Sequence, residues 1–170
     1  MKTNKNIVLL GMKGSGKSTI GKILSKKTGY KFIDIDQKIE QKENSSIFQI
    51  FQIQGENYFR NLEQDMTLKY LNQKRAVISL GGGAFLNETI RSHVISDSIS
   101  FWLDDKITTI FNRLNKSYKR PLFKKNKFKT LEKLYHNRKT IYKMANYKIN
   151  CDKLTLQEIC KKIVNLYEEK

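Results

Sequence analysis

The sequence has few residues that could cross-link a fold or carry it into a membrane. Its 170 residues include only two cysteines and one proline, and no apolar run approaches the ~20 residues of a membrane-spanning helix. Cys151 and Cys160 match no metal-binding or redox spacing, so we expect reduced thiols packed among apolar neighbours. The N-terminus leads into a strand rather than a signal-peptide core. We therefore expect a cytoplasmic protein with no membrane partner.

Acidic residues are also scarce. The chain has 16 Asp and Glu against 33 Lys and Arg, which gives a net charge of +17. Such an excess suggests an anionic partner, and nucleic acid is the first to consider. The excess is mostly lysine spread along the whole chain, however, and no zinc finger, helix-turn-helix or RNA-binding motif accompanies it. A solvated, lysine-rich surface is the favoured interpretation, and we expect no nucleic-acid partner.

Glycine, by contrast, is concentrated near the N-terminus in the stretch GMKGSGKST, residues 11–19. The spacing of Gly11, Gly16, Lys17 and Ser18 fits the Walker A phosphate-binding loop, and an apolar strand precedes it. Glycines let the backbone curl so that successive N–H groups point at a phosphate. We expect nucleotide contacts from Gly14, Ser15, Gly16, Lys17, Ser18 and Thr19. The alternative is a glycine-rich turn that binds nothing.

Strand and helix patterns alternate along the rest of the chain. Strands are expected near residues 7–10, 30–36, 75–80, 98–103 and 147–151, and helices near 16–28, 46–53, 56–71, 107–114, 131–142 and 155–167. This alternation predicts an α/β fold: a five-stranded parallel sheet with helices on both faces. The length allows one core, so we expect a single domain over residues 1–170, and a monomer.

Three polar features each follow a predicted strand: the phosphate loop, the acidic pair Asp34 and Asp36, and the glycines at 81–83. Ligands of parallel sheets bind at the carboxyl ends of the strands, so we expect these features to converge. Ser18 and Asp34 are candidate Mg²⁺ ligands, and Asp36 could orient an acceptor hydroxyl and take its proton. Acidic residues at strand ends also commonly cap helices or face solvent, which is the alternative.

Arginine is rare here, and three arginines stand out: Arg60, Arg120 and Arg138. The planar guanidinium suits two-pronged binding of a carboxylate or phosphate better than lysine does. A surface arginine that covers apolar neighbours is the alternative for each of them. Arg120 precedes Pro121 in a basic segment of little periodicity, which we expect to form a mobile lid at about 115–129.

The ordered set of motifs resembles the shikimate kinase family over nearly the whole chain. Its parts are the phosphate loop GMKGSGKSTIGK, the acidic FIDID, the helix IFQIQGENYFRNLE, the turn ISLGGG, the lid motif RPLF and the segment NRKTIYKMA. The resemblance implies phosphorylation of the 3-hydroxyl of shikimate, a step toward aromatic compounds, with ATP as co-substrate and Mg²⁺ as cofactor.

The resemblance also implies residue roles. Asp36 is the implied base, with Lys17 and Arg120 acting on the transferred phosphoryl group. Arg60 and Arg138 would hold the shikimate carboxylate, beside the backbone of Gly81, Gly82 and Gly83. The acceptor-binding segment is expected at about 36–62. Arg113 and Lys153 would contact the adenine.

Other functions use the same loop. A kinase of another small hydroxylated acid, such as gluconate, or a nucleoside monophosphate kinase is the nearest rival. A basic nucleic-acid-binding ATPase or a non-catalytic ATP-binding protein is a rival of another class. The triple glycine and the arginines favour an acceptor that carries a carboxylate, which a nucleobase pocket would not need.

Overall fold

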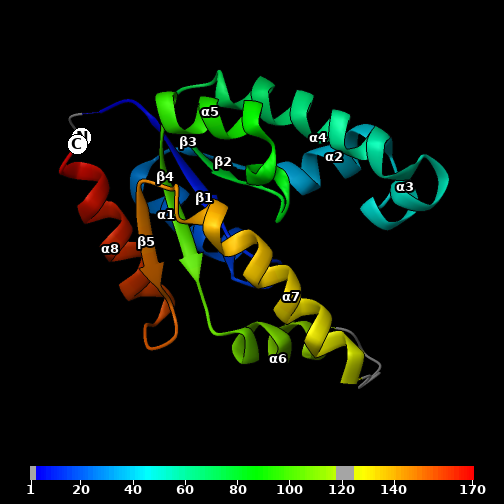
Figure 1. The fold of residues 1–170 in the computed structure, drawn as a ribbon. Helices are drawn as coiled ribbons and strands as arrows, with labels where there is room; N and C mark the ends of the chain where they lie inside the picture. Colours follow the sequence, from blue (N-terminus) through cyan, green and yellow to red (C-terminus); the bar gives the residue numbers. More distant parts are fainter. Residues whose placement is uncertain (1–2, 118–124) are drawn as a thin grey trace.

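The computed structural model describes residues 3–117 and 125–170, which form a five-stranded parallel sheet flanked by helices (Figure 1). The strand order is β2-β3-β1-β4-β5. In register, Val8 of β1 lies opposite Ile78 of β3 and Ser100 of β4. The strands are β1 Asn6–Leu10, β2 Lys31–Asp34, β3 Ala76–Ser79, β4 Ser98–Asp104 and β5 Tyr147–Asn150.

Helices cover both faces of the sheet. They are α1 Lys17–Thr28, α2 Ile35–Glu43, α3 Ile47–Ile53, α4 Gly55–Leu71, α5 Glu88–Asp97, α6 Ile107–Ser117, α7 Lys125–Tyr142 and α8 Leu156–Glu168, with a short 3₁₀ turn at Ala84–Leu86. Helices α4 and α5 lie over one face, and α1 and α8 pack together over the other (Figure 1). The expected α/β fold is thus confirmed.

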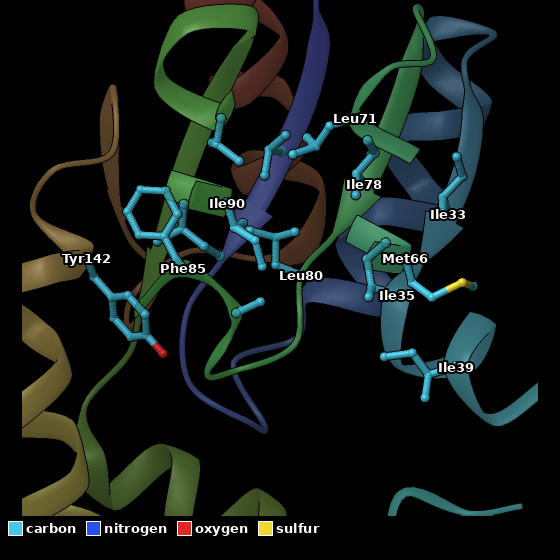
Figure 2. Packing of buried hydrophobic residues seen from close by; sticks show 14 of the residues in the cluster. Ile33, Ile35, Ile39, Met66, Leu71, Ile78, Leu80, Phe85, Ile90 and Tyr142 are labelled. Atoms are coloured by element: carbon cyan, nitrogen blue, oxygen red, sulfur yellow. The ribbon is translucent and has the colours of Figure 1, made fainter. Parts of the chain in front are cut away.

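The central strand shows why its sequence is apolar without interruption. Ile7 and Leu9 point into the core under α1 and α8, whereas Val8 and Leu10 point into the core under α4 and α5. All four side chains are at most 1% exposed. A strand covered on both faces needs apolar residues at every position, because successive side chains alternate between the faces. Figure 2 shows part of the core under α4 and α5, with Tyr142 of α7 at one edge.

The second strand is shorter than the sequence suggested. A strand was expected over residues 30–36, but β2 ends at Asp34, and Ile35 and Asp36 open helix α2. The alternation of apolar and acidic residues in FIDID imitates a strand, whereas Ile35 and Ile39 are both buried at helical spacing. The side chain of Asp34 accepts a hydrogen bond from the backbone N–H of Gln37, and so it caps the new helix. Asp36 therefore stands on a helix and not on a strand.

Two further helical regions differ from the expectation. Helix α5 was not predicted; Asn87 caps it by accepting from the Ile90 N–H at 3.1 Å. Helix α7 begins at Lys125, so the basic segment 116–129 is not irregular throughout. Arg120 and Pro121 lie outside the described residues, and the lid remains a prediction. In residues 3–117 and 125–170, no helix combines the length and apolar character needed to cross a bilayer.

Candidate active site

The expected convergence at the carboxyl ends of the strands is confirmed. A cleft of about 1040 Å³ opens there, between the phosphate loop, the N-terminus of α2, helix α4 and helix α7. Most of the predicted site residues line it: Gly14, Gly16, Lys17, Ser18, Thr19, Asp34, Asp36, Arg60, Gly82, Gly83, Arg113 and Arg138. Residues far apart in the sequence thus share one cavity.

The phosphate loop has the backbone conformation that its glycines allow. Gly14 and Gly16 adopt φ of +87° and +84°, which disfavours other residues. The loop closes through a hydrogen bond from the Ser15 N–H to the Met12 carbonyl, and α1 starts directly after it. Ser15 Oγ is buried and has no hydrogen-bond partner in the described part of the chain. A helix N-terminus with open donors beside it is suited to an anion.

Lys17 lies buried beneath this loop. Its Nζ donates to the carbonyls of Gly11 at 2.9 Å and Met12 at 3.0 Å. Burial lowers the pKa of Lys17 to about 8, although Asp36 and Asp34 act in the opposite direction. A bound phosphate would favour the protonated form, because it would add a negative charge close to the ammonium group.

Ser18 and Asp34 form a pair of oxygen ligands at the edge of the loop. The Ser18 hydroxyl donates to Asp34 Oδ2 at 2.5 Å, and Asp34 is buried. A hydroxyl and a carboxylate at the phosphate loop are the donors that Mg²⁺ prefers beside nucleotide phosphates. The residues present therefore fit the predicted magnesium site.

Asp36 and Glu63 place two carboxylates side by side. Burial raises the pKa of Asp36, with Lys17 opposing the shift and Asp34 reinforcing it. Burial also raises the pKa of Glu63, against the effect of its partner Arg60. A Cβ at Gly81 would lie 2.5 Å from Glu63 Oε1 and 2.7 Å from Asp36 Oδ1. Both acids thus approach the same glycine.

The arginines reach the cleft from two helices. Arg60 on α4 donates to Glu63 Oε2 at 2.7 Å and to Glu56 Oε1 at 3.2 Å, and its guanidinium lies over the Phe59 ring. Arg138 on α7 donates to the Gly82 carbonyl at 2.9 Å, and the Tyr142 hydroxyl donates to the same oxygen at 2.5 Å. The guanidinium groups of Arg60 and Arg138 thus both lie against the glycine turn.

The three consecutive glycines are explained by charged side chains that lie close to their Cα atoms, and not by an unusual backbone conformation. None of the three glycines has a positive φ. Instead, each passes against a different charged group: Gly81 against Asp36 and Glu63, Gly82 against Arg138, and Gly83 against Arg60, whose Nη1 would be 2.7 Å from a Cβ. A side chain at 81 or 83 would displace the site's carboxylates or an arginine.

Of the three residues predicted to contact ATP outside the phosphate loop, two lie in the described part of the chain, and of these Arg113 lines the cleft. Arg113 on α6 donates to the Gly14 carbonyl at 3.3 Å and pairs with Asp105 at 3.1 Å. Lys153 is exposed in the turn after β5 and does not line the cleft. Arg120 lies outside the described residues.

Several cleft or supporting residues were given no role from the sequence, although Glu63 and Tyr142 lie in the quoted motifs IFQIQGENYFRNLE and NRKTIYKMA. These residues are Lys13, Phe48, Phe51, Glu63, Asp105 and Tyr142. Glu63 follows Arg60 by three positions on one helix, and that spacing could have suggested the pair. The contact of Tyr142 with the Gly82 carbonyl joins residues that are far apart in the sequence, and the pair of Asp105 with Arg113 joins a strand end to helix α6.

Comparisons with known proteins agree on one family. The family model described as shikimate kinase matches residues 13–168. The shikimate kinase of Sulfurihydrogenibium sp. is 41% identical over 94% of this chain and 96% of its own length, and that of Persephonella marina is 39% identical over 94% and 97%. A solved structure of shikimate kinase from Acinetobacter baumannii in complex with shikimate superposes with a TM-score of 0.90 at 29% identity, covering 99% of this chain and 95% of that one.

Proposed function

The chain belongs to the shikimate kinase family, and from that premise we propose which residues of the cleft carry out each part of the reaction. The protein is an ATP-dependent shikimate kinase that phosphorylates the 3-hydroxyl of shikimate. The observation that carries the residue assignment is the shared cleft: Asp36, Arg60, Gly82 and Arg138 line the same cavity as the phosphate loop.

The phosphate loop holds the donor. Backbone N–H groups around Gly14 and Gly16, together with Ser15 and Thr19, surround the phosphates, and Lys17 neutralises charge on the β- and γ-phosphates. Ser18 and Asp34 would hold Mg²⁺, which would supply positive charge beside the phosphate oxygens. The hydrogen bond between Ser18 and Asp34 supports this pairing.

Asp36 activates the acceptor. The 3-hydroxyl oxygen of shikimate attacks the γ-phosphorus, the bond to the bridging oxygen of ADP breaks, and the hydroxyl proton passes to the Asp36 carboxylate. The raised pKa of Asp36 suits this step, because a base accepts a proton more readily when its pKa is nearer the working pH. Lys17 lies close enough to Asp36 to oppose that shift.

Arg60 and Arg138 bind the shikimate carboxylate from opposite sides of the glycine turn. Glu63 accepts a hydrogen bond from Nη1 of Arg60, and the Gly82 carbonyl accepts one from Nη1 of Arg138. Glu56 accepts from Nε and Nη2 of Arg60. The two guanidinium groups bind the incoming carboxylate through charge-assisted hydrogen bonds, which are stronger than bonds between neutral groups. The backbone of residues 81–83 contacts the shikimate hydroxyls.

The remaining assignments rest on the motifs alone. Arg120 in RPLF closes a lid at about 115–129 over ATP and stabilises the transferred phosphoryl group. Arg113 contacts the adenine, and Lys153 contributes at the loop after β5. We further propose that the protein works as a single-domain monomer in the cytoplasm, with no nucleic-acid partner.

An acceptor panel tests the proposal. Purified protein is given ATP and either shikimate, quinate, gluconate or a nucleoside monophosphate, and ADP release is measured over a titration of Mg²⁺. We expect rapid release with shikimate only, and none when Mg²⁺ is removed with a chelator. Activity independent of Mg²⁺, or Ser18→Ala and Asp34→Asn variants with an unchanged Mg²⁺ requirement, would contradict the magnesium assignment.

A further inference from the structure

Two adjacent aspartates at the end of β4 have very different surroundings. Asp104 is well paired: Lys148 Nζ lies 2.8 Å from its Oδ2, and the Tyr135 hydroxyl donates to its Oδ1 at 2.8 Å. Asp105 is 2% exposed, and neither carboxylate oxygen has a well-aligned hydrogen-bond partner in the described residues. Its one ion pair there is with Arg113 Nη1 at 3.1 Å. Asp105 therefore depends on Arg113 far more than Asp104 depends on any one partner.

Arg113 connects this buried carboxylate to the phosphate loop. The same Nη1 that lies next to Asp105 donates to the Gly14 carbonyl at 3.3 Å. The arginine side chain is 47% exposed and lines the cleft. Its helix also touches the loop directly, because a Cβ at Gly14 would lie 3.2 Å from the Leu114 side chain. The guanidinium thus spans from the end of β4 to the loop that holds the phosphates.

The pair is not explained by stability alone. A buried carboxylate loses its hydration, and replacing a buried ion pair with neutral groups is often neutral or stabilising. Here Asp104 and Asp152 lie close enough to disfavour the charge on Asp105 further. A long arginine side chain that is already held in one place, on the other hand, loses less freedom when a ligand binds.

We propose that Asp105 is a positioning residue for ATP: by pairing with Arg113 it holds the guanidinium between the phosphate loop and the nucleotide. The inference rests on the proposed contact of Arg113 with the adenine. Asp105 touches neither substrate, and it acts on the nucleotide only through Arg113. Shikimate binding, at the other end of the cleft, does not depend on it.

The test is the variant Asp105→Asn, which keeps the size of the side chain and removes its charge. We expect the KM for ATP and the dissociation constant for ADP to rise about three- to tenfold, as for coupled charged pairs, with kcat and the KM for shikimate within about twofold of wild type. Asp104→Asn is the matched control and should leave the ATP parameters unchanged. Circular dichroism verifies folding, and Asp105→Thr removes the charge in a second way if Asp105→Asn does not fold.

A double-mutant cycle with Arg113→Ala separates the possible outcomes. In the Arg113→Ala background, Asp105→Asn should weaken nucleotide binding no further. If Arg113→Ala weakens ATP binding and Asp105→Asn does not, the positioning role is wrong and the proposed role of Arg113 stands. If Arg113→Ala leaves ATP binding unchanged, both assignments fail. Equal effects of Asp105→Asn in the two backgrounds would mean that Asp105 does not act through Arg113.

Discussion

The two ends of the cleft are built from different parts of the chain. The proposed donor end is one continuous stretch, residues 11–19, in which loop backbone and the N-terminus of α1 form the site proposed for the phosphates. The acceptor end is assembled from side chains on three helices, with Asp36 on α2, Arg60 on α4 and Arg138 on α7, around a glycine turn. Backbone donors cannot be removed by changing a side chain, whereas charged side chains can be removed singly. We therefore expect acceptor-end substitutions to alter the shikimate parameters and leave ATP binding intact.

The largest expected effect is that of Asp36→Asn. The amide cannot accept the hydroxyl proton, so kcat should fall about 10²- to 10⁴-fold, the usual contribution of a positioned base. Steady-state kinetics give kcat, and calorimetry gives the dissociation constant for ADP, which should stay within about threefold of wild type. Asp65→Asn, an exposed change on α4, is the control. A variant with near-normal turnover would remove Asp36 from the chemistry.

The contrast between the two ends also decided what could be predicted from the sequence. The phosphate loop is a local pattern, so its conformation and the start of α1 could be predicted from nine neighbouring residues. Asp36, Arg60 and Arg138 were candidates from residue type alone, and the ordered set of motifs supplied their roles toward the acceptor. Nothing near Arg138 in the sequence indicates that its partner is the Gly82 carbonyl. The change from strand to helix at Ile35 was missed because FIDID fits both periods. Asp105 was missed because its link to the phosphate loop runs through Arg113 on α6, a contact that only the folded chain makes.

The next largest effect is expected for Arg138→Ala. Loss of a charged hydrogen-bonding partner costs about 1.5–3 kcal/mol, so the KM for shikimate should rise roughly ten- to a hundredfold. The KM for ATP should change little, because Arg138 lies at the acceptor end. Arg91→Ala on α5, whose guanidinium donates to the Phe85 and Leu86 carbonyls away from the cleft lining, is the control. If Arg138→Ala loses affinity for ATP but keeps its affinity for shikimate, the assignment of Arg138 to the acceptor end is wrong.

A smaller effect should distinguish the donor end by its pH dependence. Lys17 has a pKa lowered to about 8 by burial in the folded protein, so it loses its proton as the pH rises through about 8. If the protonated form binds phosphate, the association constant of a non-hydrolysable ATP analogue should fall about tenfold between about pH 7 and 9. Calorimetry should also detect proton uptake on binding near the top of this range. The Lys13→Gln variant is the control and should show the same pH dependence of binding. If the pH dependence is lost in Lys13→Gln, it belongs to Lys13 and not to Lys17.

The smallest effect, expected for Tyr142→Phe, tests how firmly the acceptor end is held. Tyr142 is 1% exposed, and its hydroxyl and Arg138 both donate to the Gly82 carbonyl. Removing the hydroxyl keeps the packing against Trp102 but leaves Arg138 as the sole side chain on that oxygen in the described residues. One neutral hydrogen bond contributes about 1 kcal/mol, so the KM for shikimate should rise roughly fivefold, with kcat and the ATP parameters unchanged. The effects of Tyr142→Phe and Arg138→Ala should be non-additive if both residues act through the Gly82 carbonyl. Strictly additive effects would mean instead that Tyr142 supports the core and not the acceptor.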